Sequence, residues 1–122
     1  MSIEVAVRHR LGTFRVDAAF SAGAGLTALF GRSGAGKTTL VNAVAGLLRP
    51  ERGRVAVEGQ VLLDTAAGRF VPPHRRRIGY VFQEGRLFPH LNVRQNLGFG
   101  RWFTGRRHRF GSFADTVELL GI

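Results

Sequence analysis

The chain has 122 residues and a formal net charge of +10, from 18 Lys and Arg against 8 Asp and Glu. This length suits a single domain, no apolar run approaches the roughly 20 residues that cross a bilayer, and the absence of cysteine excludes disulfides and thiolate metal sites. The N-terminal residues also lack the pattern of a secretion signal. We therefore expect a cytoplasmic protein, peripheral to any membrane on which it acts.

The first elements in the chain are expected to be strands. Residues 3–7 have the alternating pattern of a strand broken only at Ala6, and residues 14–20 are predicted to form a second strand, joined to the first through Gly12. Residues 26–30 form a short apolar run without alternation, which is typical of a buried strand. The N-terminal quarter of the chain is therefore predicted to be β-rich.

The most informative motif follows this run and fits the phosphate-binding pattern G-x-x-x-x-G-K-[ST] at every position. It consists of Gly31, Arg32, Ser33, Gly34, Ala35, Gly36, Lys37 and Thr38. Glycines let the backbone N–H groups surround phosphate oxygens, while Lys37 would reach the β- and γ-phosphates and Thr38 would ligate Mg²⁺. We include Thr39, the next residue, in the predicted nucleoside-triphosphate site. The alternative is a glycine-rich surface loop.

The middle of the chain is expected to continue as an α/β arrangement. Residues 39–48 have the apolar spacing of a helix, which Gly46 and Pro50 help to end. Residues 54–57 and 60–64 would form a hairpin around the Glu58-Gly59 turn. A loop is expected over residues 65–77, with Arg75, Arg76 and Arg77 as a solvated turn, followed by an apolar strand at 78–82.

The last third of the sequence is expected to contain two helices. Asn92 would cap a helix that begins at Val93 and runs towards Phe99. A basic and aromatic connection at 100–111 leads to the second helix at 113–120, with Ser112 at its capping position and Gly121 at its end.

The run RRRIGYVFQEGRLFPHLNV at residues 75–93 resembles the Q-loop region of ABC-transporter ATPase subunits. That resemblance implies a role for Gln83 in ligating Mg²⁺ or orienting the attacking water; the alternative is a glutamine that ends an edge strand. Together with the motif FGRSGAGKTTL, this run makes the sequence look most like the ATP-binding subunits of bacterial molybdate importers. Relatives that import sulfate, iron or sugars share much of the pattern.

The resemblance implies an ABC-type P-loop NTPase core with an N-terminal antiparallel β subdomain, truncated before the signature of the helical subdomain. Residues 1–122 would be the N-terminal part of one nucleotide-binding domain. Its β-rich part would comprise 1–30 and 54–82, its phosphate loop and helix 31–48, and its Q-loop and first helical residues 83–122. The LSGGQ signature, the strand that ends in the catalytic Glu and the switch histidine are not in this sequence. We therefore expect little hydrolysis by the chain alone.

The same resemblance implies ATP and Mg²⁺ as cofactors, with transmembrane permease subunits and a second ATPase copy as partners. The protein would then lie at the cytoplasmic face of the inner membrane. Family members place an aromatic ring before the phosphate loop to stack on adenine; Phe14 is the first candidate and His9 the second, although Phe14 could equally be a core residue.

Other classes of function remain as alternatives. Direct nucleic-acid binding would use the charge of +10, but no zinc-finger spacing, basic heptad or RNA-binding aromatic signature accompanies it. A P-loop kinase or GTPase would share the phosphate loop. The four histidines form no i,i+4 metal pair.

Overall fold

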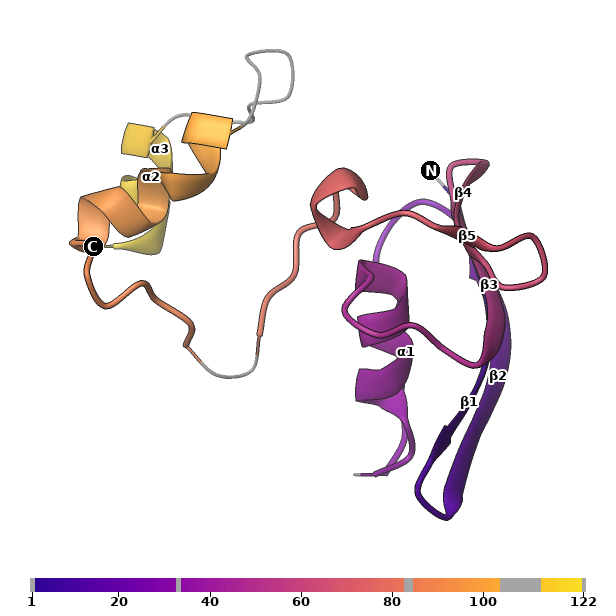
Figure 1. Cartoon of the computed structure of the whole chain (residues 1–122). Coiled ribbons are helices and arrows are strands. Elements are labelled where there is room, and N and C mark those ends of the chain that lie inside the picture. Colours follow the sequence, from indigo (N-terminus) through magenta and orange to yellow (C-terminus); the bar gives the residue numbers. More distant parts are fainter. Residues whose placement is uncertain (1, 33, 83–84, 104–112, 122) are drawn as a thin grey trace. The chain divides into compact units, whose positions relative to one another are not determined.

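The computed structural model describes residues 2–32, 34–82, 85–103 and 113–121 (Figure 1). The chain divides into two compact units, Met1–Tyr80 and Val81–Ile122, and each is considered by itself. Among the described residues, no helix combines the length and apolar character that a membrane span requires.

The first unit contains a five-stranded antiparallel sheet with the order β2-β1-β3-β4-β5. Left-handed backbone at Gly12 joins the first two strands, and left-handed backbone at Glu58 and Gly59 joins the third and fourth. Both expected hairpins are confirmed, because each needs only a short local turn. The strands are β1 (Ile3–Leu11), β2 (Phe14–Ala22), β3 (Arg52–Val57), β4 (Gln60–Asp64) and β5 (Arg69–Phe70).

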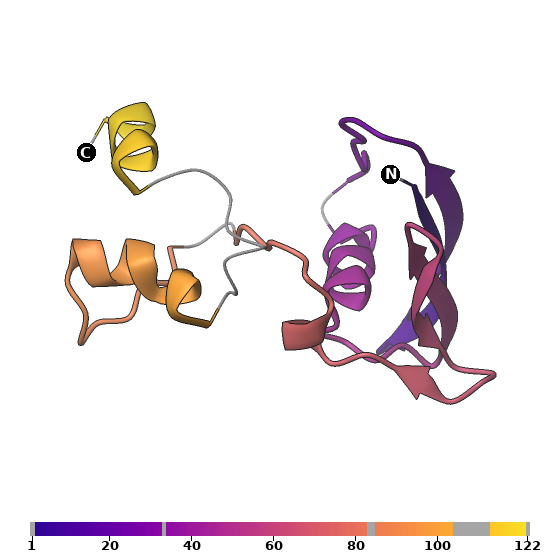
Figure 2. The ribbon, with the colours of Figure 1, turned by 90° about the horizontal axis from the view of Figure 1, so that it is seen from above.

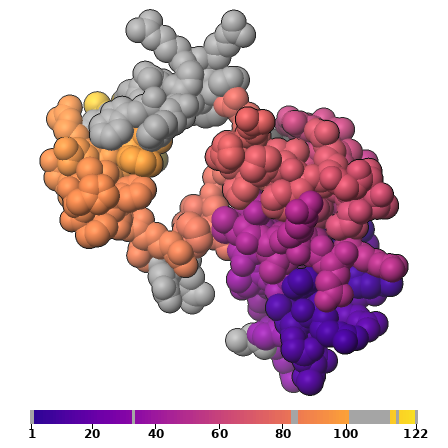
Figure 3. All heavy atoms as spheres, in the orientation of Figure 1, coloured from indigo at the N-terminus to yellow at the C-terminus, as the bar shows by residue number. Residues whose placement is uncertain are grey.

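Helix α1 (Lys37–Ala45) packs against one face of this sheet (Figures 1 and 2). In β1 the buried residues Val5 and Val7 alternate with exposed ones, whereas β3 and β4 each bury two consecutive residues. In the space-filling view of Figure 3, the magenta atoms of the α1 region lie against the pink and salmon atoms of the later segments. The core consists of Val5, Val7, Val16, Leu40, Ala43, Val55, Leu62 and Leu63.

Two segments that were expected to be strands are not. Residues 26–30 and 78–82 form no strand, and the side chains of Leu26, Phe30 and Val81 are almost fully exposed. The strands of the sheet are antiparallel, and most of them pair with the strand that follows a short turn. An apolar strand without alternation is typical of a different setting, a sheet that is covered on both faces. Among the described residues, neither segment pairs with a neighbouring strand.

The expectation of a loop over residues 65–77 is wrong in two short stretches. Strand β5 extends the sheet, and a 3-10 turn, η1, occupies Pro73–Arg75. The Asp64 carboxylate accepts hydrogen bonds from the backbone N–H groups of Ala66 and Ala67, which closes the turn between β4 and β5. This turn returns the chain to the sheet, so two β5 residues can pair with β4.

The second unit contains helices α2 (Val93–Phe103) and α3 (Phe113–Leu120). Asn92 caps α2 as expected: its side chain accepts from the Gln95 N–H, and the Gln95 side chain accepts from the Asn92 N–H. Gly121, in the left-handed region at φ 70°, follows α3. Ser112, the predicted cap of α3, lies outside the described residues.

Candidate nucleotide-binding site

The phosphate loop lies between the exposed segment 26–30 and helix α1, and two of its glycines adopt backbone that other residues avoid. Gly34 and Gly36 have φ values of 81° and 93°. The Ala35 N–H donates to the Arg32 carbonyl at 3.1 Å, which closes a tight turn. Gly36 is buried against Val16 of β2, where an added Cβ would lie 2.6 Å from a Val16 methyl group. The loop is therefore anchored to the sheet at its last glycine.

Among the described residues, no side chain caps the N-terminal end of α1. Its cap residue is Gly36, which makes no side-chain hydrogen bond, and its first turn contains no acidic residue. The first hydrogen bond of the helix runs from the Leu40 N–H to the Gly36 carbonyl at 3.1 Å. The free N–H groups and the helix dipole make this end attractive to an anion.

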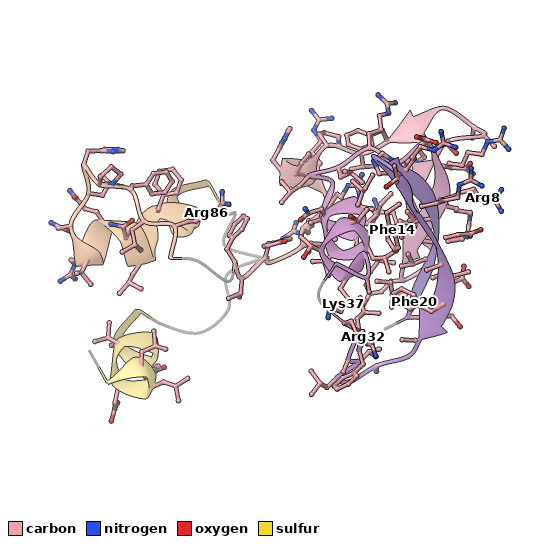
Figure 4. All side chains as sticks on the ribbon, turned by 90° about the horizontal axis from the view of Figure 1, so that it is seen from below. Arg8, Phe14, Phe20, Arg32, Lys37 and Arg86 are labelled. Atoms are coloured by element: carbon pink, nitrogen blue, oxygen red, sulfur yellow. The ribbon has the colours of Figure 1, made fainter. Side chains whose placement is uncertain are left out.

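Lys37 adds a full positive charge to the same place. Its Nζ donates to the carbonyl oxygens of Gly31 and Arg32, the second at 3.3 Å. Figure 4 shows the side chains of Lys37 and Arg32 at the same end of the first unit. The ammonium group thus lies over its own loop, within reach of an anion held there.

The two threonines after Lys37 are in different environments. Thr38 is exposed in the first turn of α1, whereas Thr39 is 7% exposed and lies among the core residues. The Thr38 side chain is therefore accessible, as its predicted role as a Mg²⁺ ligand requires. The Thr39 side chain is buried, so it is less open to a ligand than that of Thr38.

The two candidates for adenine stacking lie on neighbouring strands. Phe14 is 45% exposed and shares a strand face with Val16, against which Gly36 packs. His9 pairs with Val16 across the sheet, and its Nδ1 accepts from the Glu51 N–H at 3.2 Å. The face of Phe14 is therefore the face that meets the phosphate loop, and its ring is accessible.

Two predicted site residues, Ser33 and Gln83, lie outside the described residues. The chain that leads to Gln83 is described as far as Phe82, and the Tyr80 hydroxyl donates to the Asn42 side-chain oxygen of α1 at 2.7 Å. A hydrogen bond therefore joins this segment to the helix that follows the phosphate loop.

One residue was misjudged from the sequence. Arg76, expected in a solvated turn, is 5% exposed and donates three hydrogen bonds to backbone carbonyls. Arg75 and Arg77 on either side are exposed, as expected. The sequence alone does not show which of three consecutive arginines is buried, because the 3-10 turn decides which side chain faces inward.

The sequence pattern that defines the ABC transporter family matches residues 15–122. The chain belongs to this family. The match includes the phosphate loop, α1 and all of the second unit, so the glycine-rich loop is part of a larger family pattern.

Several curated relatives carry the name molybdenum import ATP-binding protein ModC. The chain is 57% identical to those of Mesorhizobium japonicum and Rhizobium etli over all of its 122 residues, and 53% identical to that of Paramagnetospirillum magneticum over 98% of its length. These matches cover 33%, 34% and 33% of the relatives. The chain therefore spans about a third of the length of the curated relatives it matches.

Proposed function

We propose that this chain is part of the ATP-binding component of an ABC importer for molybdate. The observation that carries the proposal is the open N-terminal end of α1, with Gly36 anchored on Val16 and the Lys37 ammonium over the loop. Relatives named for molybdenum import support the choice of solute. ATPases for sulfate, iron or sugars are the alternative within the family.

The residues of the loop fit a triphosphate. Backbone N–H groups of residues 31–37 would hold phosphate oxygens, with Lys37 neutralising charge on the β- and γ-phosphates. Thr38, together with Gln83, would ligate Mg²⁺, and the metal would further neutralise charge on the phosphate oxygens. Phe14 would stack on the adenine ring. Residues 1–122 would act as the N-terminal part of one nucleotide-binding domain, with the β-rich part at 1–30 and 54–82 supporting the loop and helix at 31–48.

The partners belong to the proposal as well. Residues 83–122 would begin the helical subdomain that faces the transmembrane permease subunits, and a second ATPase copy would complete each nucleotide site. The protein would then act peripherally at the cytoplasmic face of the inner membrane. The family and the absence of a membrane-spanning helix among the described residues are consistent with this arrangement.

Equilibrium binding of Mg-ATP to the wild-type chain and to Lys37→Ala tests the proposal. Loss of the ammonium removes hydrogen bonds between charged groups, worth about 1.5–3 kcal/mol, so affinity should fall roughly ten- to hundredfold. Equal affinity in the two proteins would contradict a phosphate-loop site. In parallel, DNA binding should be weak and nearly indifferent to Lys37→Ala, because one cation among many phosphate contacts changes little.

A further inference from the structure

The C-terminal end of α1 is held by a buried arginine. Arg76 Nη1 donates to the carbonyl oxygens of Ala43 and Val44 at 2.9 and 3.0 Å, and Nε donates to the Val71 carbonyl at 2.6 Å. The two Nη1 bonds reach carbonyl groups in the last turn of α1, of which the Ala43 carbonyl also accepts from the Gly46 N–H at 3.4 Å. They also place a cation at the negative end of the helix dipole.

The surroundings of Arg76 leave it little room, and its Nη2 is buried without a hydrogen-bond partner among the described residues. Gly46, which ends α1 at φ 85°, passes so close that an added Cβ would lie 2.7 Å from Nε. The guanidinium lies 4.9 Å from the centre of the Phe70 ring, and Arg49 lies at the same distance from that ring. Burial lowers the pKa of Arg76 from its usual value, but an arginine in a protein stays protonated. The buried guanidinium is therefore charged, and backbone carbonyl groups accept hydrogen bonds from it.

A second contact continues the attachment along the chain. The Tyr80 hydroxyl donates to the Asn42 side chain at 2.7 Å, and the Asn42 carbonyl accepts from the N–H groups of Leu47 and Leu48. Figures 1 and 2 both show η1 beside α1. The segment from Val71 to Tyr80 is therefore fastened to the last two turns of the helix whose first turn forms the phosphate site.

We infer that Arg76 is a positioning residue for the phosphate loop, acting through α1, with Tyr80 in a supporting role. The inference deepens the proposed function and rests on it. A helix of nine residues is a rigid element about 13 Å long. If its C-terminal end is released, its first turn loses its alignment with Val16, and a phosphate-binding geometry tolerates little displacement.

Amide hydrogen exchange in the absence of nucleotide gives the first test. In Arg76→Met the Leu40 amide, which forms the first hydrogen bond of α1, should exchange roughly tenfold faster relative to the amides of β1 and β3. Arg75→Met, an exposed neighbour, is the matched control and should leave that ratio unchanged. Exchange that rises only near Gly46, or by the same factor everywhere, would overturn the inference.

Mg-ATP binding gives the second test, measured well below the unfolding transition of each variant. Affinity should fall about tenfold in Arg76→Met and stay at the wild-type value in Arg75→Met. If Arg76→Met does not fold, Arg76→Lys, which keeps the charge but loses the planar fork, and Tyr80→Phe replace it in both tests. Wild-type affinity in a folded Arg76 variant would overturn the inference. Failure of the wild-type chain to bind would instead overturn the proposed function, and the exchange ratios would still decide whether Arg76 acts on the first turn.

Discussion

The two ends of α1 are built in opposite ways. At the N-terminal end the cap is a glycine, no side chain of the described residues caps the backbone N–H groups, and a lysine lies over its own loop. At the C-terminal end a left-handed glycine and the buried Arg76 give the last carbonyl groups their partners. The comparison teaches that the helix is secured where no ligand is expected, which lets the other end stay open for an anion.

The largest effect is expected from adding one methyl group at Gly36, the glycine that packs against β2. Gly36→Ala places a Cβ 2.6 Å from Val16 at a positive φ. Left-handed backbone costs an alanine about 1–2 kcal/mol, and overpacking adds about 1–3 kcal/mol, so the free energy of unfolding should fall by roughly 2–5 kcal/mol. Urea denaturation measures this change.

Gly34→Ala is the matched control for that substitution. Its φ of 81° is also left-handed, but an added Cβ meets nothing within 4 Å. Only the backbone cost should remain, about 1–2 kcal/mol. Equal losses in the two variants would show that Gly36 is not pressed against Val16.

The next largest effect is expected on the binding of the adenine base of ATP rather than of its phosphates. Phe14→Ala should weaken ATP binding by about 1–3 kcal/mol, the range for base stacking on an aromatic ring. Binding of inorganic tripolyphosphate, which has no base, should not change. If both ligands lose affinity equally, Phe14 supports the sheet and does not stack on adenine.

A smaller effect is expected at α2, whose N-terminal end contrasts with that of α1. Here Asn92 and Gln95 satisfy each other's backbone N–H groups. Asn92→Ala should destabilise the first turn of α2 by about 1 kcal/mol, whereas Asn92→Gly should cost only a few tenths. Amide exchange at Gln95 measures both. Identical exchange in wild type and Asn92→Ala would mean that the cap contributes nothing to the helix.

Lys37→Ala is expected to have no effect on ATP hydrolysis by this chain. The signature sequence and the catalytic Glu of the family are not among these 122 residues, so phosphate release by the chain should equal that of Lys37→Ala. A steady-state phosphate assay measures this. Faster phosphate release by the wild-type chain than by Lys37→Ala would mean that these 122 residues contain more of the catalytic machinery than we propose.

The features that could be predicted from sequence are those fixed by neighbours in the chain. The hairpin turns at Gly12 and Gly59, the glycine end of α1 and the Asn92 cap each depend on a few adjacent residues. The phosphate loop could be recognised because its glycines and its lysine occupy fixed positions. The roles assigned to residues 31–39 of the loop, to Phe14 and to Gln83 stay predictions.

The features that could not be predicted depend on distant partners. Residues 26–30 and 78–82 have strand composition, but a strand exists only beside another strand, and composition does not supply one. Arg76 looks like its neighbours until the 3-10 turn directs it under α1. The closeness of Gly36 to Val16, twenty residues earlier, is likewise a tertiary contact that no local pattern encodes.

Lys37 is the single lysine of the chain, which makes its accessibility the most direct test of the proposed site. Modification by an amine-reactive reagent, followed by mass spectrometry with and without Mg-ATP, compares Lys37 with the α-amino group of the same molecule. The account predicts that Mg-ATP slows modification of Lys37 strongly and leaves the α-amino group unaffected. Equal modification of Lys37 at saturating Mg-ATP would contradict a triphosphate bound at the open end of α1.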